Sequence, residues 1–208
     1  MAYSFLEIAR TPNVIAAQNE NGSAELYGRP DIPRDYTHFT PKEAAFIAER
    51  DSFYLATVSE TGWPYVQHRG GPVGFLRLLD ERTLAFADYR GNRQYISIGN
   101  ATANNRVSLF LMDYPNRRRL KIFARMETKR LDTDTALAFA TSSPGYPGKS
   151  ERVILFHLEA FDWNCPQHIT PRFSEVEMVQ ALEPVRIRME QLEAENARLR
   201  ERLGEAPP

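Results

Sequence analysis

Apolar and polar residues alternate along the middle of the 208-residue chain, and this pattern predicts a β-rich domain. Residues 53–58 alternate with period two, residues 59–62 have the composition of a tight turn, and residues 63–69 continue as a second strand. Further strands are predicted at 74–79, 83–87, 107–112, 120–130 and 152–161. Six or more strands with short helices between them predict an α+β, mainly β fold built on an antiparallel barrel.

Helix signals lie between these strands and before them. Thr40-Pro41-Lys42-Glu43 is a capping box with proline at the first helical position, so a helix is predicted up to Glu49. Another helix is predicted at about 94–102, and a third, capped by Asp132 or Thr133, through about 141. Residues 5–10 predict a short helical turn, and 14–17 are helical or extended. We interpret residues 1–39 as an ordered N-terminal arm and residues 40–172 as the main domain.

The C-terminal segment, residues 173–208, follows a heptad pattern instead. Position a is taken by Met189, Asn196 and Leu203, and position d by Val185, Leu192 and Leu199. In this register Arg188 and Glu195 are at position g, and Glu193 and Arg200 are at position e. In a parallel homodimer, Arg188 of one chain would face Glu193 of the other, and Glu195 would face Arg200. This predicts a dimeric coiled coil that starts near Glu183-Pro184. The alternative is a solvated helix that packs on its own domain, because fewer than three heptads make a marginal zipper.

Composition narrows the class of protein. A formal net charge of −1 argues against wholesale binding to a nucleic-acid backbone. No apolar run approaches the roughly 18 residues of a membrane span, and no signal-peptide pattern is visible. Cys165 is the only cysteine, which excludes an internal disulfide framework and favours a reducing compartment. The expected location is therefore cytoplasmic.

The sequence contains no recognisable set of catalytic acid, base and nucleophile. Cys165-x-x-His168 has the spacing of metal ligands, but no second pair stands nearby, so no metal site is predicted. This favours a reactive group borrowed from a cofactor. The candidate anion binders are Arg69, Arg93 and the basic run 117–121, with ordinary surface charge as the alternative for each. Arg93 lies just before a predicted helix, where exposed N–H groups favour a phosphate.

Three segments carry a family resemblance: RDSFYLATVSETGWPYVQHRGGP at 50–72, FADYRGNRQYISIGNATANNRVSLFLMDYP at 86–115 and RLKIFARME at 119–127. They resemble the pyridoxamine 5′-phosphate oxidase-like family of flavin-binding split β-barrels, and WNCPQHI at 163–169 resembles one subgroup of it. The resemblance covers roughly residues 40–172. It implies a homodimer with FMN at the subunit interface. It further implies an oxidoreductase that transfers a hydride between the flavin and a small molecule, with NAD(P)H or another electron donor.

The resemblance also implies which residues hold FMN. Gln67, His68 and Arg69 would lie along the isoalloxazine ring and the ribityl chain, and Ala87 and Asp88 would touch the edge of the ring. Arg93 and Gln94 would hold the phosphate. Arg119 would come from the second subunit, and Trp163 and Asn164 would lie near a segment that closes over the ring. Gln94 stands where the family has a lysine, so a second charge must come from elsewhere, for example from Arg69.

The C-terminal region departs from the family pattern, and this bears on the substrate. True pyridoxamine phosphate oxidases have a basic, tryptophan-bearing segment where this chain has WNCPQHITPRF, so the vitamin B6 phosphate is not the expected substrate. One alternative function is a non-catalytic flavin carrier, or a split barrel that holds haem or a deazaflavin, with His68 or His168 as the candidate iron ligand. Another is a dimeric interaction protein whose coiled coil recruits a partner.

Overall fold

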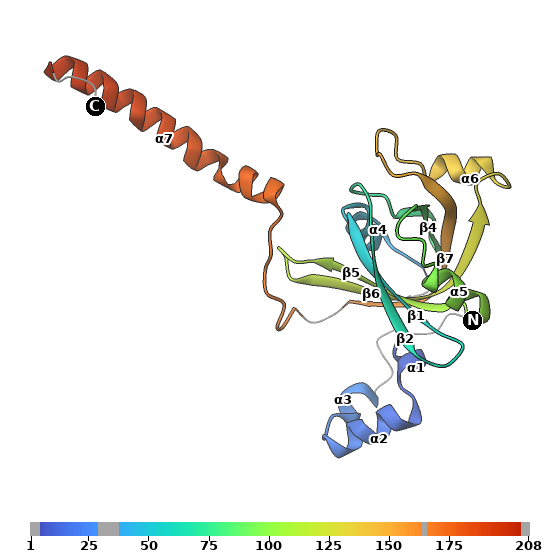
Figure 1. Ribbon diagram of the computed structural model, residues 1–208. Helices are drawn as coiled ribbons and strands as arrows, with labels where there is room; N and C mark the ends of the chain where they lie inside the picture. The colour runs from blue at the N-terminus through green and yellow to red at the C-terminus, as the bar shows by residue number, and fades with distance from the viewer. Residues whose placement is uncertain (1–4, 29–37, 164–165, 205–208) are drawn as a thin grey trace. The chain divides into compact units, whose positions relative to one another are not determined.

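The fold is taken from a computed structural model, which describes residues 5–28, 38–163 and 166–204 (Figure 1). The chain divides into two compact units. The larger unit comprises Met1–Asp113 and Arg117–His168, and the smaller one comprises Tyr114–Asn116 and Ile169–Pro208.

Seven strands of the larger unit form one antiparallel sheet. The strands are β1 (Ser52–Val58), β2 (Pro64–Gly70), β3 (Arg77–Asp80), β4 (Thr83–Tyr89), β5 (Arg106–Asp113), β6 (Arg118–Arg130) and β7 (Ser150–Trp163). Their order in the sheet is β2-β1-β5-β6-β7-β4-β3, with every neighbouring pair antiparallel. The sheet is therefore split between its edge strands β2 and β3, which do not pair with each other among the described residues. The predicted antiparallel β architecture is confirmed.

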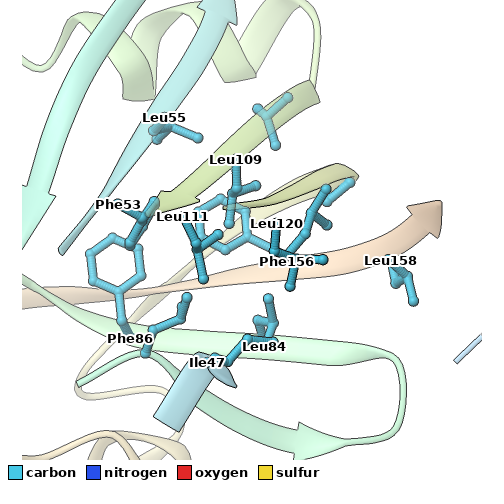
Figure 2. Packing of buried hydrophobic residues seen from close by; sticks show 14 of the residues in the cluster. Ile47, Phe53, Leu55, Leu84, Phe86, Leu109, Leu111, Leu120, Phe156 and Leu158 are labelled. Atoms are coloured by element: carbon cyan, nitrogen blue, oxygen red, sulfur yellow. The ribbon is translucent and has the colours of Figure 1, made fainter. Parts of the chain in front are cut away.

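The hydrophobic core lies on one face of this sheet, where the apolar positions of the alternating strands meet (Figure 2). The predicted alternation of β6 is confirmed, because its apolar positions are buried at Leu120, Ile122, Ala124 and Met126. A cluster of phenylalanine rings fills the space between the two halves of the sheet, with ring centroids 5.5 to 6.0 Å apart; its members are Phe53, Phe75, Phe86 and Phe156. Burial of large apolar side chains is the main stabilising contribution to such a unit.

Helix α4 (Pro41–Ala48) has the predicted capping box at Thr40 and Glu43. Its Phe46 and Ile47 are buried in the core. Glu43 is also buried, which the pattern does not indicate: Oε1 accepts a hydrogen bond from Trp163 Nε1 at 2.5 Å. The carboxylate therefore ties the first turn of α4 to the end of β7.

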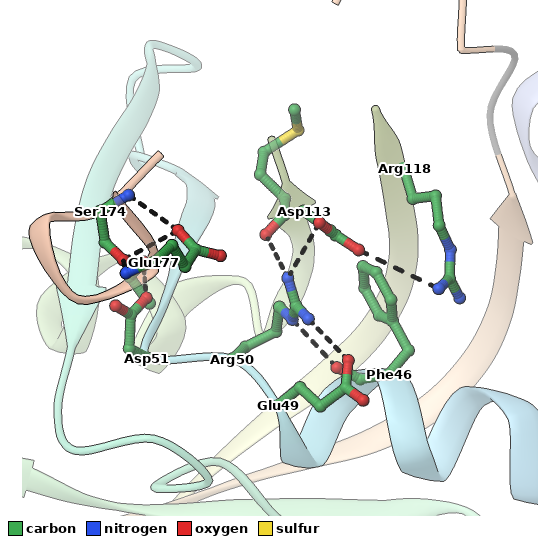
Figure 3. A network of polar contacts seen from close by, with 10 residues as sticks. Phe46, Glu49, Arg50, Asp51, Asp113, Arg118, Ser174 and Glu177 are labelled. Atoms are coloured by element: carbon green, nitrogen blue, oxygen red, sulfur yellow. Dashed lines mark hydrogen bonds and ion pairs between the residues drawn. The ribbon is translucent and has the colours of Figure 1, made fainter. Parts of the chain in front are cut away.

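Arg50, just beyond the helix, fastens α4 to β5 (Figure 3). Its Nε donates to Phe46 O and its Nη1 donates to Met112 O, both at 3.1 Å. The guanidinium also lies 3.9 Å from the buried carboxylate of Asp113. The side chain of Arg50 is 13% exposed, and this position is acceptable for an arginine because several of its donors have acceptors.

The remaining helices of the larger unit are short. They are α1 (Phe5–Ala9), α2 (Pro12–Glu20), α3 (Ala24–Gly28), α5 (Ile96–Ala103) and α6 (Thr135–Ala140). In the N-terminal arm, α1 packs on the sheet, because the ring of Phe5 stacks on Phe123 with centroids 4.3 Å apart. The predicted cap of α6 at Asp132 or Thr133 is wrong: Asp134 caps the helix by accepting from Leu137 N at 2.9 Å. Asp132 is instead paired with Arg130.

The smaller unit contains α7 (Glu175–Leu203), whose predicted start near Glu183 is wrong. The helix begins at Glu175, and its N-cap Ser174 forms a capping box with Glu177 (Figure 3). Pro184 lies inside the helix rather than at its start. Because proline has no backbone N–H, one helical hydrogen bond is lost at this position, but the helix continues. Among the described residues, no helix combines the length and apolarity that a bilayer crossing requires.

Candidate cofactor site

A cavity of about 220 Å³ lies beside β2, β4 and the loop before α5. Its lining includes Gln67, Arg69, Asp88, Arg93 and Glu151. Strands β2 and β4 stand five positions apart in the sheet order, so only the curl of the sheet brings them together. Arg69 Nη1 donates to Asp88 Oδ1 at 2.9 Å and bridges the split between the two strands.

Asp88 lies between two arginines. Arg152 is the direct cross-strand partner of Asp88 in the β4–β7 ladder, and its Nε lies 3.3 Å from Asp88 Oδ2. Asp88 is 5% exposed. Burial raises the pKa of Asp88 above its ordinary value, and the positive charges of Arg69 and Arg152 offset only part of that effect. The carboxylate is thus held in place by two ion pairs in a poorly solvated position.

The loop before α5 has an unusual backbone that presents Arg93. Arg93 and Tyr95 both adopt left-handed conformations, with φ of 63° and 52°. Non-glycine residues in this region are disfavoured and persist only where the surroundings hold them. The Tyr95 hydroxyl donates to Glu151 Oε2 at 3.0 Å, and the Arg152 guanidinium lies 4.7 Å from the centre of the Tyr95 ring. Two adjacent residues of β7 therefore hold the loop in this conformation.

Hydrogen-bond donors are in excess around the cavity. Arg69 and Tyr89 line the cavity, and Arg69 Nε and Tyr89 Oη are buried side-chain atoms without a hydrogen-bond partner among the described residues. Buried polar groups are normally paired, so such a concentration requires an explanation. Arg69 Nε can only donate a hydrogen bond, and the Tyr89 hydroxyl can also donate one. An anion with several acceptor oxygens, such as a phosphate, fits this donor set.

Four of the residues implied by the family resemblance come together at the cavity: Gln67, Arg69, Asp88 and Arg93. Gln67 Oε1 accepts from Ser97 Oγ at 3.0 Å, which links β2 to the first turn of α5. Gln94 belongs to the same loop and accepts from Asn92 Nδ2 at 3.1 Å, but it does not line the cavity. Ala87 is buried and pairs with Val153 across the β4–β7 ladder.

The other implied residues lie elsewhere. His68 is exposed on the opposite face of β2, edge-on to its cross-strand neighbour Tyr54 with ring centroids 5.7 Å apart. Arg119 lies on β6, with its guanidinium 5.7 Å from the centre of the Phe110 ring. Trp163 packs against α4. Asn164 and Cys165 lie outside the described residues.

Four contributors to the site were not predicted from the sequence: Tyr89, Tyr95, Glu151 and Arg152. Glu151 and Arg152 lie near the start of β7, and no sequence motif there indicates that they belong to a binding site. The antiparallel register that places Arg152 beside Asp88 joins segments more than 60 residues apart, so local patterns do not reveal it. Alternation in β2 did carry a usable signal, since neighbouring strand residues point to opposite faces and Gln67 and Arg69 are thereby separated from His68.

Comparison with known protein families gives a match over a large part of the chain. The family model for "Pyridoxamine 5'-phosphate oxidase" matches residues 39–150, which is more than half of the sequence. No curated protein sequence matches the chain.

Several solved structures are similar to this chain. One is described as a putative pyridoxamine 5′-phosphate oxidase from Lactobacillus delbrueckii, 20% identical, with a TM-score of 0.47, covering 62% of this chain and 96% of that one. A second is HupZ of Group A Streptococcus, 18% identical, with a TM-score of 0.49 and coverages of 65% and 100%. A third is an FMN-binding protein from Syntrophomonas wolfei, 11% identical, with a TM-score of 0.48 and coverages of 73% and 97%.

Proposed function

Because the chain belongs to the pyridoxamine 5′-phosphate oxidase family, we propose that it is a flavoprotein that binds FMN with the phosphate in the cavity beside β2 and β4. The observation that carries the proposal is the surplus of buried donors there, contributed by Arg69 and Tyr89. With Arg93 on the rim, the site offers positive charge and hydrogen-bond donors to a dianionic group.

The volume of the cavity supports a binding mode in which only part of FMN lies inside it. The cavity measures about 220 Å³. Sites that enclose a whole drug-sized ligand measure roughly 300–1,000 Å³. The cavity therefore suits the phosphate and the adjoining sugar chain, and the flavin ring would lie outside it.

Each residue has a definite part in this proposal. Arg69 and Arg93 bind the phosphate, and Asp88 holds Arg69 in position through the 2.9 Å hydrogen bond. Gln67 is oriented by Ser97, so its amide group is available to the sugar chain or to the ring edge. FMN, when bound, supplies reversible hydride chemistry at its ring. Arg69, Asp88 and Glu151 line the cavity and are engaged in ion pairs, so the reactive group is expected from the cofactor.

We further propose that the protein oxidises or reduces a small molecule other than the vitamin B6 phosphate, with NAD(P)H or another donor. The support is the family membership together with the sequence at 163–173, which lacks the basic segment that would hold that phosphate.

A homodimer with FMN at the interface is part of the same proposal. On the face of β1 and β2 opposite Gln67 and Arg69, the apolar side chains of Tyr54, Val58 and Val66 are exposed. A largely apolar groove of about 530 Å³ runs near β1, β5 and β6. A second copy would cover this apolar surface. Arg119, whose Nε is buried without a hydrogen-bond partner, is the candidate group contributed to the other copy's flavin.

A parallel coiled coil through α7 would reinforce this dimer. Because the helix begins at Glu175, the heptad pattern extends by one further a and d pair, Leu182 and Met178. The apolar seam then consists of exposed residues at Met178, Leu182, Val185, Met189, Leu192, Leu199 and Leu203. Pro184 occupies position c, away from the seam. The longer repeat removes the objection that fewer than three heptads make a marginal zipper.

The visible spectrum of the purified protein tests the cofactor. Flavin bands, or their appearance on addition of FMN, are expected, and bleaching by NAD(P)H without oxygen would support the oxidoreductase. A colourless protein that takes up no FMN would overturn the proposal, and a haem spectrum would replace it with the haem-binding alternative.

Analytical ultracentrifugation tests the coiled coil. The full-length double variant Leu192→Lys/Leu199→Lys is expected to raise the dimer dissociation constant, whereas Gln191→Lys, at position c, should not. Equal dissociation constants for both variants would exclude α7 from the interface.

A further inference from the structure

Arg152 contacts two residues, Asp88 and Tyr95, that support the proposed phosphate-binding arginines Arg69 and Arg93. Its Nε lies 3.3 Å from Asp88 Oδ2, and Asp88 in turn binds Arg69. The same guanidinium lies 4.7 Å from the centre of the Tyr95 ring, and Tyr95 fixes the loop that carries Arg93. The side chain of Arg152 is thus in contact with Asp88, which supports Arg69, and with Tyr95, which supports the loop that carries Arg93.

Arg152 itself does not belong to the cavity lining among the described residues. Its side chain is 19% exposed, and its Nη2 donates to Glu151 Oε2 at 3.1 Å. Glu151 also accepts from the Tyr95 hydroxyl. Arg152, Glu151 and Tyr95 therefore contact one another. Of the three, Glu151 and Arg152 lie beyond the segment 39–150 that matches the family.

We infer that Arg152 is a positioning residue that makes this site selective for a phosphorylated flavin. The inference rests on the proposed function. Without Arg152, Asp88 loses one of two guanidinium partners and no longer has a unique orientation, so Arg69 is less well directed at the phosphate. Tyr95 loses the cation above its ring, and the left-handed loop conformation that presents Arg93 loses a support. Both effects act at the phosphate end of the ligand, so the flavin ring should be bound as before.

Comparison of FMN with riboflavin isolates this role, because the two ligands differ only by the phosphate. In the full-length protein, Arg152→Ala is expected to weaken FMN binding about tenfold, or about 1.4 kcal/mol, and to leave riboflavin affinity within about twofold. Arg152→Lys should give an intermediate loss, since lysine keeps the charge but not the planar fork that reaches two partners. The lysine variant also serves if the alanine variant fails to fold.

The matched control is Arg130→Ala, which removes the exposed cross-strand neighbour of Arg152 on β6 and should change neither affinity. In an Arg69→Ala background, the loss of FMN affinity caused by Arg152→Ala should shrink, because part of it acts through Arg69. Equal losses for FMN and riboflavin, or unchanged FMN affinity, would overturn the inference. A wild-type protein that binds no FMN would overturn the proposed function itself, which is a separate result.

Discussion

The variant Glu43→Ala is expected to destabilise the larger unit, although Glu43 lies away from the proposed cofactor site. The side chain is 3% exposed, and its two oxygens serve different elements. Oε1 accepts from Trp163 Nε1 at 2.5 Å, and Oε2 accepts from the backbone N–H of Thr40 at 3.1 Å. Alanine removes both acceptors, leaves the indole N–H without its partner, and opens one half of the capping box.

The expected magnitude follows from these two losses. A lost helix cap typically costs about 1 kcal/mol. A buried donor left without an acceptor costs about 1–3 kcal/mol. The free energy of unfolding should therefore fall by about 2–4 kcal/mol, which for a protein of this size lowers Tm by about 5–15 °C. Glu43→Gln keeps an oxygen acceptor for the indole and should lose only about 1 kcal/mol, since the charged hydrogen bonds become neutral.

The pH dependence has a definite sign. Burial raises the pKa of Glu43, but the hydrogen bonds from Thr40 and Trp163 together lower it further, so the pKa lies below its ordinary value of 4.5. A carboxyl group with a lowered folded-state pKa contributes stability above its unfolded pKa, and this contribution is lost as pH falls through the folded value. The stability difference between wild type and Glu43→Gln should therefore narrow when the pH is lowered from 6 to below about 4.

Urea unfolding followed by circular dichroism and tryptophan fluorescence provides the measurement. The chain has two tryptophans: Trp63 is 75% exposed, so changes in fluorescence on unfolding report mainly on Trp163. Glu60→Ala, in the exposed turn between β1 and β2, is the control and should lie within about 0.5 kcal/mol of wild type. If Glu43→Ala also fell within that range, the link between α4 and β7 would contribute nothing to stability and the reasoning would be refuted.

Two further predictions concern the strand β2 and the residues after it. Gly71→Ala should destabilise by about 1–3 kcal/mol through overpacking, because an added Cβ would lie 2.6 Å from the buried Phe75 ring. Gly91→Ala, where a Cβ meets no atom within 4 Å, should not, and equal unfolding midpoints for the two variants would contradict the packing argument. His68→Ala should leave the FMN dissociation constant within twofold and cost about 0.5–1 kcal/mol from the lost contact with Tyr54. A tenfold loss of affinity in a titration would instead place the outer face of β2 in the site.

Local patterns were sufficient for most of the secondary structure. Period-two alternation predicts the buried face of β6, and the capping box at Thr40 predicts the start of α4. These features depend on residues a few positions apart, whose geometry is set by the backbone of the element itself. Where two local signals competed, the sequence was misleading: Pro184 indicated a helix start, whereas the capping box at Ser174 decides it.

The candidate site was only half determined by the sequence. Gln67, Arg69, Asp88 and Arg93 could be named from a family resemblance, and they do come together. Their supports depend on tertiary structure. Arg152 reaches Asp88 because antiparallel pairing places them directly opposite each other, and Arg69 reaches Asp88 because the sheet curls until its distant strands meet. Register and curl are set by the packing of the whole sheet around its core, a property of many residues at once that no single stretch of the chain encodes.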